Sequence, residues 1–454
     1  MAVSVRFLPQ TPQRILQAVE QTMSSTTFEE RKSVALAACF NDKRCHRRLI
    51  GHRARTFDFQ FHPTEDAAIS ASEDGTARVW DLSSGRCAKS LEGHNKKHEV
   101  LRACWAPPEA ANDSVSVATG SADGIVRLWG IRHGDGRDEK SGVDRYQSLK
   151  VVGQLRHRNE AKGLDGQVYS CHFIPDPSGG APPSSAAAMC LLTASDSSVH
   201  LWDVETRKRV SSRALSKVGA HSIGGERNPD DLAFVFDAKP RPGSGSSVLA
   251  VALSDGTVRV GDVLQQGEKA AVLRGVTDTH LTSLAWSDDG TVLASCGGNG
   301  TITVWDTRTW TARSVLWGHS RPVYGAAFYP CAGNGGGGAA AAAGAAATSG
   351  QDCPPQLLLS WSSDETVCAW DTGRATGDAT APLATLSVEE GYPVYSCSVS
   401  ADGRRFALAG GGGDEKSAGF LGVPIKLVDL SDEARAKDGK ESFADNGSNE
   451  PAQG

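Results

Sequence analysis

The eight residues "DGTARVWD" (74–81) decide the fold, because their pattern returns along the chain. Asp74 and Gly75 form a turn signal, and the alternating residues up to Trp80 predict a β-strand after that turn. Five further copies are "DGIVRLWG" (123–130), "DSSVHLWD" (196–203), "DGTVRVGD" (255–262), "NGTITVWD" (299–306) and "DETVCAWD" (364–371), with a weaker copy, "PIKLVD", at 424–429. In every strong copy the turn residue precedes the Trp position by six residues, which indicates a repeat architecture.

Three more strand-like segments accompany each copy. Around the first copy they are "TFDFQFHP" (56–63), "AAISAS" (67–72) and "RCAKSL" (86–91). Alternation of apolar and polar residues between Gly, Pro and Asp predicts short strands joined by tight turns. A Gly-His or similar pair often comes first, at Gly51-His52, Gly93-His94, Ala220-His221 and Gly318-His319. Each unit is therefore expected to hold four strands.

Residues 46–430 resemble the WD-repeat family of β-propellers in this order of Gly-His, turn Asp and strand Trp. The resemblance implies an all-β fold, a seven-bladed propeller of four-stranded antiparallel blades. It also implies that a strand near 45–50, in "CHRRLI", completes the last blade and closes the ring. The expected domains are an N-terminal helical extension (1–44), the propeller (45–430) and a disordered polar tail (431–454).

The N-terminal extension predicts two short helices. "TPQRILQAVEQTM" (11–23) begins with Thr11 as N-cap and Pro12 in the first turn. "TFEERKSVALAACF" (27–40) offers Thr27 and Glu30 as a capping box. These helices either pack on the propeller or present an amphipathic face to a partner.

The repeated polar residues have a structural role in the family. The resemblance implies a hydrogen-bonded tetrad made of the loop His, a Ser or Thr of the second strand, the turn Asp and the strand Trp. This chain can build the full set three times, as His52, Ser70, Asp74, Trp80, as His94, Thr119, Asp123, Trp129, and as His319, Ser360, Asp364, Trp370. Ser, His and Asp together also suit a hydrolase, but their repetition around a ring favours architecture over catalysis.

Three copies depart from the pattern. The fourth has Gly261 in place of Trp and Val251 in place of Ser or Thr, the fifth has Asn299 as its turn residue, and the seventh lacks the turn Asp and the Trp. We expect these blades to be looser and held mainly by apolar strands. Long insertions, among them the charged segment 133–148, are interpreted as surface padding.

Composition excludes several function classes. The chain has 454 residues and a net charge of −6, which gives no electrostatic case for nucleic acid or an anionic membrane. The 11 cysteines form no CxxC pair, and no run approaches the ~18 apolar residues of a membrane span. No P-loop or zinc spacing occurs, so neither an enzyme nor a cofactor or metal is expected. No early stretch resembles a signal peptide, and a cytoplasmic or nuclear protein is expected.

Two groups of residues are candidate partner contacts. In the family, the loop before the first strand and the turn between the second and third strands open on one face, the top. Contacts are commonly carried there, at positions held by Arg55, Glu73, Glu99, Gln167, Asp231 and His280, with Ser195, Ser254 and Ser363 beside them. The second group is Phe420 and Leu421, in the Gly-rich loop "GGGGDEKSAGFLGVP" (410–424).

Two functions remain. The first is a noncatalytic protein–protein interaction scaffold, a subunit or adaptor of a multiprotein complex that binds proteins or peptides. The alternative is a substrate receptor of a cullin-RING ubiquitin ligase, because "LASCGGNGTITVWDTR" (293–308) resembles the box that docks some WD-repeat proteins on the ligase adaptor. Trp305, Asp306 and Arg308 match that box, and Asn299 departs from it. The repeat alone accounts for Trp305 and Asp306, so the alternative depends on Arg308.

Overall fold

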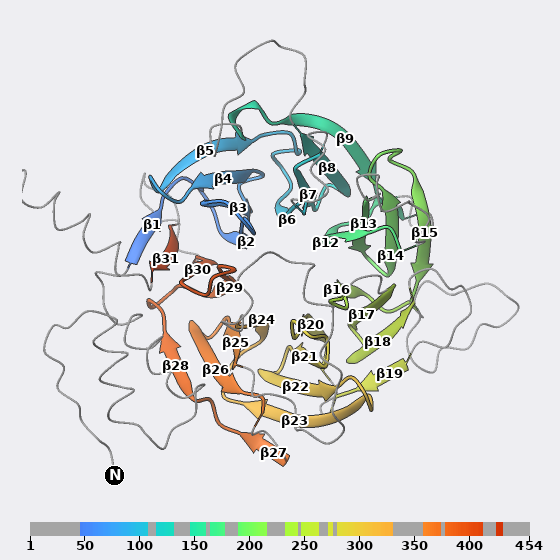
Figure 1. Cartoon of the computed structure of the whole chain (residues 1–454), viewed down its shortest axis with the longest axis vertical. Coiled ribbons are helices and arrows are strands. Elements are labelled where there is room, and N and C mark those ends of the chain that lie inside the picture. Colours follow the sequence, from blue (N-terminus) through green and yellow to red (C-terminus); the bar gives the residue numbers. More distant parts are fainter. Residues whose placement is uncertain are drawn as a thin grey trace, which may run out of the picture.

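The structure is a computed structural model that describes residues 46–107, 115–130, 146–159, 164–177, 189–215, 232–243, 247–262, 271–275, 279–329, 357–373, 377–411 and 424–429. Figure 1 shows seven sheets set as blades around a common centre, with one strand of each blade innermost. The all-β, seven-bladed propeller predicted from the repeats is confirmed. The helices expected within 1–44, the loop residues Phe420 and Leu421, and the tail 431–454 lie outside the described residues.

The first three blades follow one another along the chain. Blade 1 consists of β2 (Thr56–Phe61), β3 (Ala67–Ser72), β4 (Ala77–Asp81) and β5 (Arg86–Leu91). Blade 2 consists of β6 (Val100–Trp105), β7 (Val117–Ser121), β8 (Ile125–Gly130) and β9 (Lys150–Arg156). Blade 3 consists of β12 (Val168–Pro175), β13 (Met189–Ser195), β14 (Ser198–Asp203) and β15 (Arg209–Ala214). A separate two-stranded hairpin, β10 (Arg158–Asn159) and β11 (Leu164–Asp165), precedes blade 3.

The remaining blades complete the ring. Blade 4 consists of β16 (Val235–Pro240), β17 (Val248–Leu253), β18 (Thr257–Asp262) and β19 (Ala271–Arg274). Blade 5 consists of β20 (Leu281–Trp286), β21 (Val292–Gly297), β22 (Thr301–Asp306) and β23 (Thr311–Trp317). Blade 6 consists of β24 (Val323–Phe328), β25 (Leu357–Ser362), β26 (Thr366–Asp371) and β28 (Ala384–Ser387). Blade 7 consists of β29 (Val394–Val399), β30 (Arg405–Gly410), β31 (Ile425–Asp429) and β1 (His46–Leu49).

Blade 7 joins the two ends of the propeller. β1, the segment for which the sequence predicts the closing strand, pairs antiparallel with β31 from His46 opposite Val428 to Leu49 opposite Ile425. The side chain of Leu49 is fully buried in a cluster shared by blades 7 and 1. Pairing the first strand with the last covers the sheet edges that an open ring would leave exposed.

Each innermost strand carries a β-bulge after its first residue, as between Thr56 and Asp58 in β2 and between Val394 and Ser396 in β29. A bulge re-aims the side chains around it. In blade 1 the third residue of the strand, Asp58, is buried and accepts a hydrogen bond from the backbone N–H of Ala103 in blade 2 at 3.1 Å. The bulge therefore directs this position toward the neighbouring blade.

Asp237 of β16 occupies the same strand position and connects three blades. Its carboxylate accepts hydrogen bonds from Ser170 Oγ of blade 3 at 3.0 Å and Ser283 Oγ of blade 5 at 2.9 Å. Burial opposes the charge of this carboxylate, but Lys239 and His172 nearby outweigh that effect and lower its pKa. Buried carboxylates thus join the inner strands of neighbouring blades by directional hydrogen bonds, which apolar packing does not supply.

Two features depart from the expected blades. The insertion 133–148 was interpreted as surface padding, but Tyr146 at its end is 1 % exposed, packs 5.2 Å from the ring of Trp105, and donates a hydrogen bond to Glu65 at 2.9 Å. Blade 5 also has a fifth strand, because β27 (Gly377–Thr380) pairs parallel with the outer edge of β23. The repeated sequence pattern predicts neither feature, because each is formed by a connecting segment that packs against a blade.

Candidate functional site

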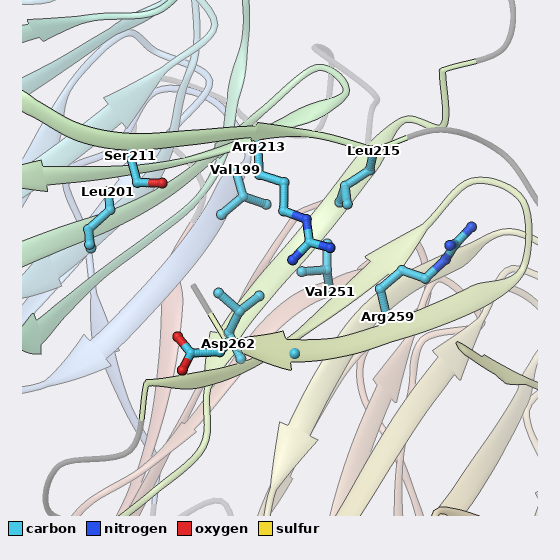
Figure 2. Close-up of a pocket in the computed structure, with 10 residues that line it drawn as sticks. Val199, Leu201, Ser211, Arg213, Leu215, Val251, Arg259 and Asp262 are labelled. Atoms are coloured by element: carbon cyan, nitrogen blue, oxygen red, sulfur yellow. The ribbon is translucent and has the colours of Figure 1, made fainter. Parts of the chain in front are cut away.

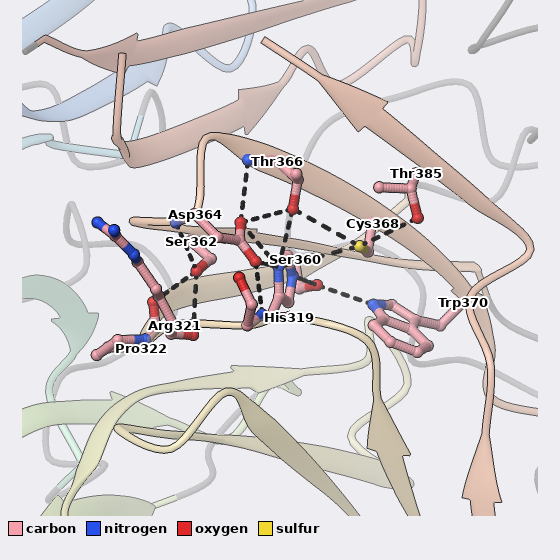
Figure 3. Close-up of polar contacts among 11 residues, drawn as sticks. His319, Arg321, Pro322, Ser360, Ser362, Asp364, Thr366, Cys368, Trp370 and Thr385 are labelled. Carbon is pink, nitrogen blue, oxygen red and sulfur yellow. Dashed lines mark hydrogen bonds and ion pairs between the residues drawn. The ribbon is translucent and has the colours of Figure 1, made fainter. Parts of the chain in front are cut away.

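The blade 6 tetrad shows the geometry of the repeated polar group (Figure 3). Trp370 Nε1–H donates to Ser360 Oγ at 2.8 Å, and His319 Nε2 lies 2.8 Å from the same oxygen. His319 Nδ1 lies 3.0 Å from Asp364 Oδ2, and the carboxylate of Asp364 accepts the backbone N–H of Ser320 at 2.9 Å. The chain of contacts therefore connects the strand Trp to the turn and to the loop that carries the His.

Blades 1 and 2 contain the same arrangement. In blade 1, Ser70 Oγ accepts from Trp80 Nε1 at 2.8 Å and lies 2.7 Å from His52 Nε2, while His52 Nδ1 lies 2.9 Å from Asp74. In blade 2, the corresponding distances are 2.8 Å for Trp129 to Thr119, 2.7 Å for His94 to Thr119, and 3.3 Å for His94 to Asp123. The structure thus brings together all four members of each predicted set.

The residue two positions before the Trp distinguishes the three histidines. Burial lowers the pKa of His52 and of His94, and the guanidinium groups of Arg78 and Arg127 lower it further, against the hydrogen bonds to Asp74 and Asp123. In blade 6 this position holds Cys368 and supplies no cation. Burial still opposes the charge of His319, but its contacts with Asp364 and Cys368 outweigh burial and raise the pKa of His319 to about 9.

A partial set in blade 3 was missed from the sequence. His157 Nε2 lies 2.7 Å from Thr193 Oγ1, which also accepts Trp202 Nε1–H at 3.0 Å. Arg156 stands where a Gly precedes the other loop histidines, which hid the motif. His157 Nδ1 has no hydrogen-bond partner. Burial, and to a smaller extent the charge of the nearby His200, lower the pKa of His157 to about 3. In blade 5, Trp305 Nε1 donates to Ser295 Oγ at 2.9 Å.

These groups are buried, so a hydrolytic reading fails on access as well as on repetition. Ser70, Thr119 and Ser360 are all fully buried, and each accepts a hydrogen bond from the Trp of its own blade. A nucleophile needs an approach path for its substrate. Each tetrad thus connects the loop before a blade to the second and third strands of that same blade.

A second repeated contact places the predicted top-face residues. In each of six blades the backbone N–H before or at the turn residue donates to the carbonyl of the residue that precedes the innermost strand. Examples are Glu73 to Arg55 at 2.9 Å, Ala122 to Glu99 at 2.9 Å and Gly298 to His280 at 2.9 Å. Arg55 Nε also lies 3.6 Å from the carboxylate of Glu73. In these six blades the loop and the turn are thus joined at the top face, which we call the rim.

The fourth blade differs from the predicted register of this rim. Asp231 lies outside the described residues, and the carbonyl that accepts the N–H of Ser254 at 2.9 Å belongs to Phe234. Phe234 is therefore the rim residue that corresponds to Arg55 and Glu99. Because blade 4 departs from the repeat pattern, the start of its first strand could not be located from the sequence.

Inside the rim lies a group of aromatic side chains that sequence reasoning did not single out. They are the second residues of five innermost strands, Phe57, Tyr169, Phe236, Tyr324 and Tyr395, and all are half-buried. The ring of Tyr395 lies 5.5 Å from Phe57 and 5.0 Å from Tyr324, and that of Phe236 lies 6.4 Å from Tyr169. We call these five residues the aromatic rim. Their fixed place beside the bulge was the signal available in the sequence.

The predicted contacts Gln167 and His280 border the aromatic rim. The hydroxyl of Tyr169 donates to Gln167 Oε1, and the ring of His280 lies 5.7 Å from that of Phe236. Burial, with the charges of Asp196 and Glu99, raises the pKa of Tyr169. This face therefore combines aromatic surface with nearby groups of both charges.

Arg308 lies on the opposite face, in the turn between β22 and β23. Its Nη2 lies 3.1 Å from Asp306 Oδ2, and its backbone N–H donates to Asp306 Oδ1 at 2.9 Å. Its side chain remains 61 % exposed. The residue that the ligase hypothesis requires is therefore accessible, and its orientation is set by the Asp of its own motif.

The described residues hold no group of three His, Cys, Asp or Glu placed to bind a metal ion. Within that same part of the chain, no helix has the length and apolar character needed to cross a membrane.

Comparison with known proteins agrees with the repeats. Residues 43–81, 85–130 and 267–306 match the family model described as "WD domain, G-beta repeat". A guanine nucleotide-binding protein subunit beta of Oryza sativa subsp. japonica is 24 % identical over 62 % of this chain and 60 % of its own length. The nuclear distribution protein PAC1-2 of Uncinocarpus reesii is 28 % identical over 53 % of this chain and 47 % of its own length. The chain thus spans about half to three fifths of these relatives.

A third relative, mitochondrial division protein 1 of Aspergillus oryzae, is 28 % identical over 49 % of this chain and 33 % of its own length. These relatives carry different names, so similarity does not select one activity for the chain. The matched repeats and the seven-bladed ring make this chain a WD-repeat β-propeller protein.

Proposed function

We propose that this protein is a noncatalytic interaction scaffold, a subunit or adaptor of a multiprotein complex, whose top face binds an extended segment of a partner protein. The aromatic rim is the observation that carries the proposal. Tyr and Phe supply large contact area at low conformational cost and are enriched at interfaces. Similarity to a protein named as a subunit supports a role in an assembly. The proposed location is the cytoplasm or the nucleus.

The composition of the rim favours a partner segment of mixed character. Arg55 and Glu73 lie together, and Glu99 and Asp196 lie near Tyr169, so no single charge dominates. We expect the partner to bury apolar or aromatic side chains against Tyr324 and Tyr395, with polar groups meeting the surrounding loops. Such a site gives specificity through shape and rim contacts more than through net charge.

Affinity purification with mass spectrometry tests this proposal on the full chain. The double variant Tyr324→Ser/Tyr395→Ser removes two adjacent members of the aromatic rim, and Trp317→Ser removes an aromatic side chain that is 48 % exposed away from it. We expect the double variant to lose the partners that the wild type and the Trp317→Ser control both capture. Equal capture by all three proteins would remove the aromatic rim as the binding site.

A second function, substrate receptor of a cullin-RING ubiquitin ligase, has one observation in its favour. The guanidinium group of Arg308 is exposed on the face opposite the aromatic rim, which leaves the top face open for a substrate while the adaptor docks below. Co-purification with the adaptor that is lost in Arg308→Ala but kept in Arg404→Ala, at another exposed turn Arg, would support it. No association at native expression levels would eliminate it.

A further inference from the structure

Four aromatic rings lie in contact on the top face, over blades 3, 4 and 5. The ring of Phe234 lies 4.9 Å from that of Tyr169 and 5.0 Å from that of Phe236. The imidazole of His280 lies 5.7 Å from the ring of Phe236. All four side chains are half-buried or exposed. We call these four residues the four-ring cluster, which adds Phe234 and His280 to two members of the aromatic rim.

The surrounding turns hold the four-ring cluster in place. Val235, which lies between the two phenylalanines of the cluster, donates its backbone N–H to the carbonyl of Asp196 in the blade 3 turn at 2.6 Å. The imidazole of His280 lies across Gly298, where a Cβ atom would collide with the ring. Rings that are positioned before a ligand arrives lose little conformational freedom on binding. The cluster is therefore suited to bind a side chain of a partner.

Two carboxylates give the four-ring cluster a negative environment. Glu99, the rim residue of blade 2, is half-buried, and its carboxylate forms no ion pair with any residue that the structure describes. Asp196 is attached to the cluster through the backbone of Val235. Burial raises the pKa of Tyr169, and the charges of Asp196 and Glu99 raise it further, with no described cation opposing them. A positive group would therefore be stabilised beside Tyr169.

The other part of the aromatic rim has balanced charges. Arg55 Nε lies 3.6 Å from the carboxylate of Glu73, so the two groups form an ion pair. Burial raises the pKa of Tyr395, while Arg55 lowers it and Glu73 raises it. The opposing charges beside Tyr395 contrast with the two carboxylates beside Tyr169. The four-ring cluster is thus the part of this face where the described charges favour a cation.

The pocket between blades 3 and 4 is too small for a side chain of a partner. Figure 2 shows this pocket, which Arg213 of β15 and Val251 of β17 help to line. Its volume is about 30 Å³, which is enough for water but not for a long side chain. We therefore expect a ligand of these two blades to lie on the four-ring cluster, at the surface.

The chemistry of the cluster identifies the side chain that it would take. The face of an aromatic ring attracts a cation, and a nearby carboxylate adds to this attraction. We propose that the four-ring cluster binds a lysine or arginine side chain of the partner segment, with Glu99 as the counter-charge. This inference rests on the proposed top-face function and names the partner chemistry at one end of that site.

Selection from a random peptide library displayed on phage, with the full chain as bait, tests the inference. We expect the wild type to select peptides that share a Lys or Arg at one position. Glu99→Lys reverses the counter-charge and should abolish this preference, because like charges repel. Glu205→Lys makes the same change at an exposed residue in the turn between β14 and β15, on the opposite face, and should select the same peptides as the wild type.

Fluorescence anisotropy then compares one selected peptide with a form in which Gln replaces the basic residue. We expect the wild type to bind the Gln form at least about ten-fold more weakly. Phe236→Leu retains apolar area but removes the ring, so it should weaken the basic peptide more than the Gln form. Trp317→Leu removes an exposed ring outside the cluster and should change neither. If Phe236→Leu fails to fold, His280→Leu, at an exposed position, replaces it.

The possible failures of this inference and of the proposed function can be told apart. Selected peptides that Tyr324→Ser/Tyr395→Ser fails to bind, but that share no Lys or Arg, would overturn this inference and leave the top-face function standing. An unchanged preference in Glu99→Lys, or equal weakening of both peptide forms by the ring variant, would also overturn it. Peptides that the double variant and the wild type select equally would count against the aromatic rim itself, and a library that yields no enriched peptide would count against both.

Discussion

Replacing Ser360 by Ala tests how the tetrads stabilise the propeller. Ser360 is fully buried, and its Oγ is the acceptor of Trp370 Nε1–H at 2.8 Å and the partner of His319 Nε2 at 2.8 Å. The variant leaves two buried polar groups without a partner. Each such group costs about 1–3 kcal/mol, so the free energy of unfolding should fall by about 2–6 kcal/mol.

Blade 5 supplies the matched comparison. Ser295 accepts from Trp305 Nε1 at 2.9 Å, and no loop His is bonded to it among the described residues. Ser295→Ala therefore orphans one donor and should cost about 1–3 kcal/mol. Ser360→Thr retains the hydroxyl, as Thr119 does in blade 2, and should restore most of the loss.

Urea unfolding followed by tryptophan fluorescence and far-UV circular dichroism measures the effect. Since a protein of this size need not unfold in two states, the midpoints are compared only if both probes coincide and the slope is unchanged. The reasoning is refuted if Ser360→Ala lowers the midpoint no more than Ser295→Ala does, or if Ser360→Thr is as damaging as Ser360→Ala.

The remaining predictions concern titration, closure and the inner strands. The folded pKa of His319 (about 9) lies above its unfolded value of 6.5, so its contribution to stability is complete below pH 6.5 and is lost as pH rises through about 9. NMR titration of the imidazole should show this, and Cys368→Arg should lower that pKa, whereas an unchanged pKa would contradict the comparison with blades 1 and 2. Deleting residues 1–50 removes β1 and should lower the melting temperature strongly; an unchanged value would argue against closure by this strand. Asp237→Ala removes the acceptor of three buried donors in blades 3 and 5 and should cost about 3 kcal/mol or more in denaturant titrations, and a loss below about 1 kcal/mol would contradict its connecting role.

Much of the candidate site followed from the resemblance to WD-repeat propellers. That resemblance grouped His52, Ser70, Asp74 and Trp80 by their places in the repeat, and the structure joins them by short hydrogen bonds. His157 was missed because Arg156 replaces the Gly that marks the loop. Its role depends on lying beside Thr193 and Trp202, which is a property of the folded blade.

The aromatic rim was missed for a related reason, because the sequence shows the strand position of its members and not the contacts between their rings. Tyr324 and Tyr395 belong to different blades and are 71 positions apart (395 − 324), yet their rings lie 5.0 Å from each other. Contacts between blades join residues that share no local pattern.

The sequence by itself determined the repeat, the number of blades and the strand order, because turn residues and period-2 alternation act within a few residues of each other. Tertiary structure alone decided which residues meet across neighbouring blades, including the pairing of β27 with the edge of β23 and the contact of Tyr324 with Tyr395. The physical reason is that a blade forms by local hydrogen bonding, whereas an interface depends on the shape and charge of two blades brought together by closure of the ring.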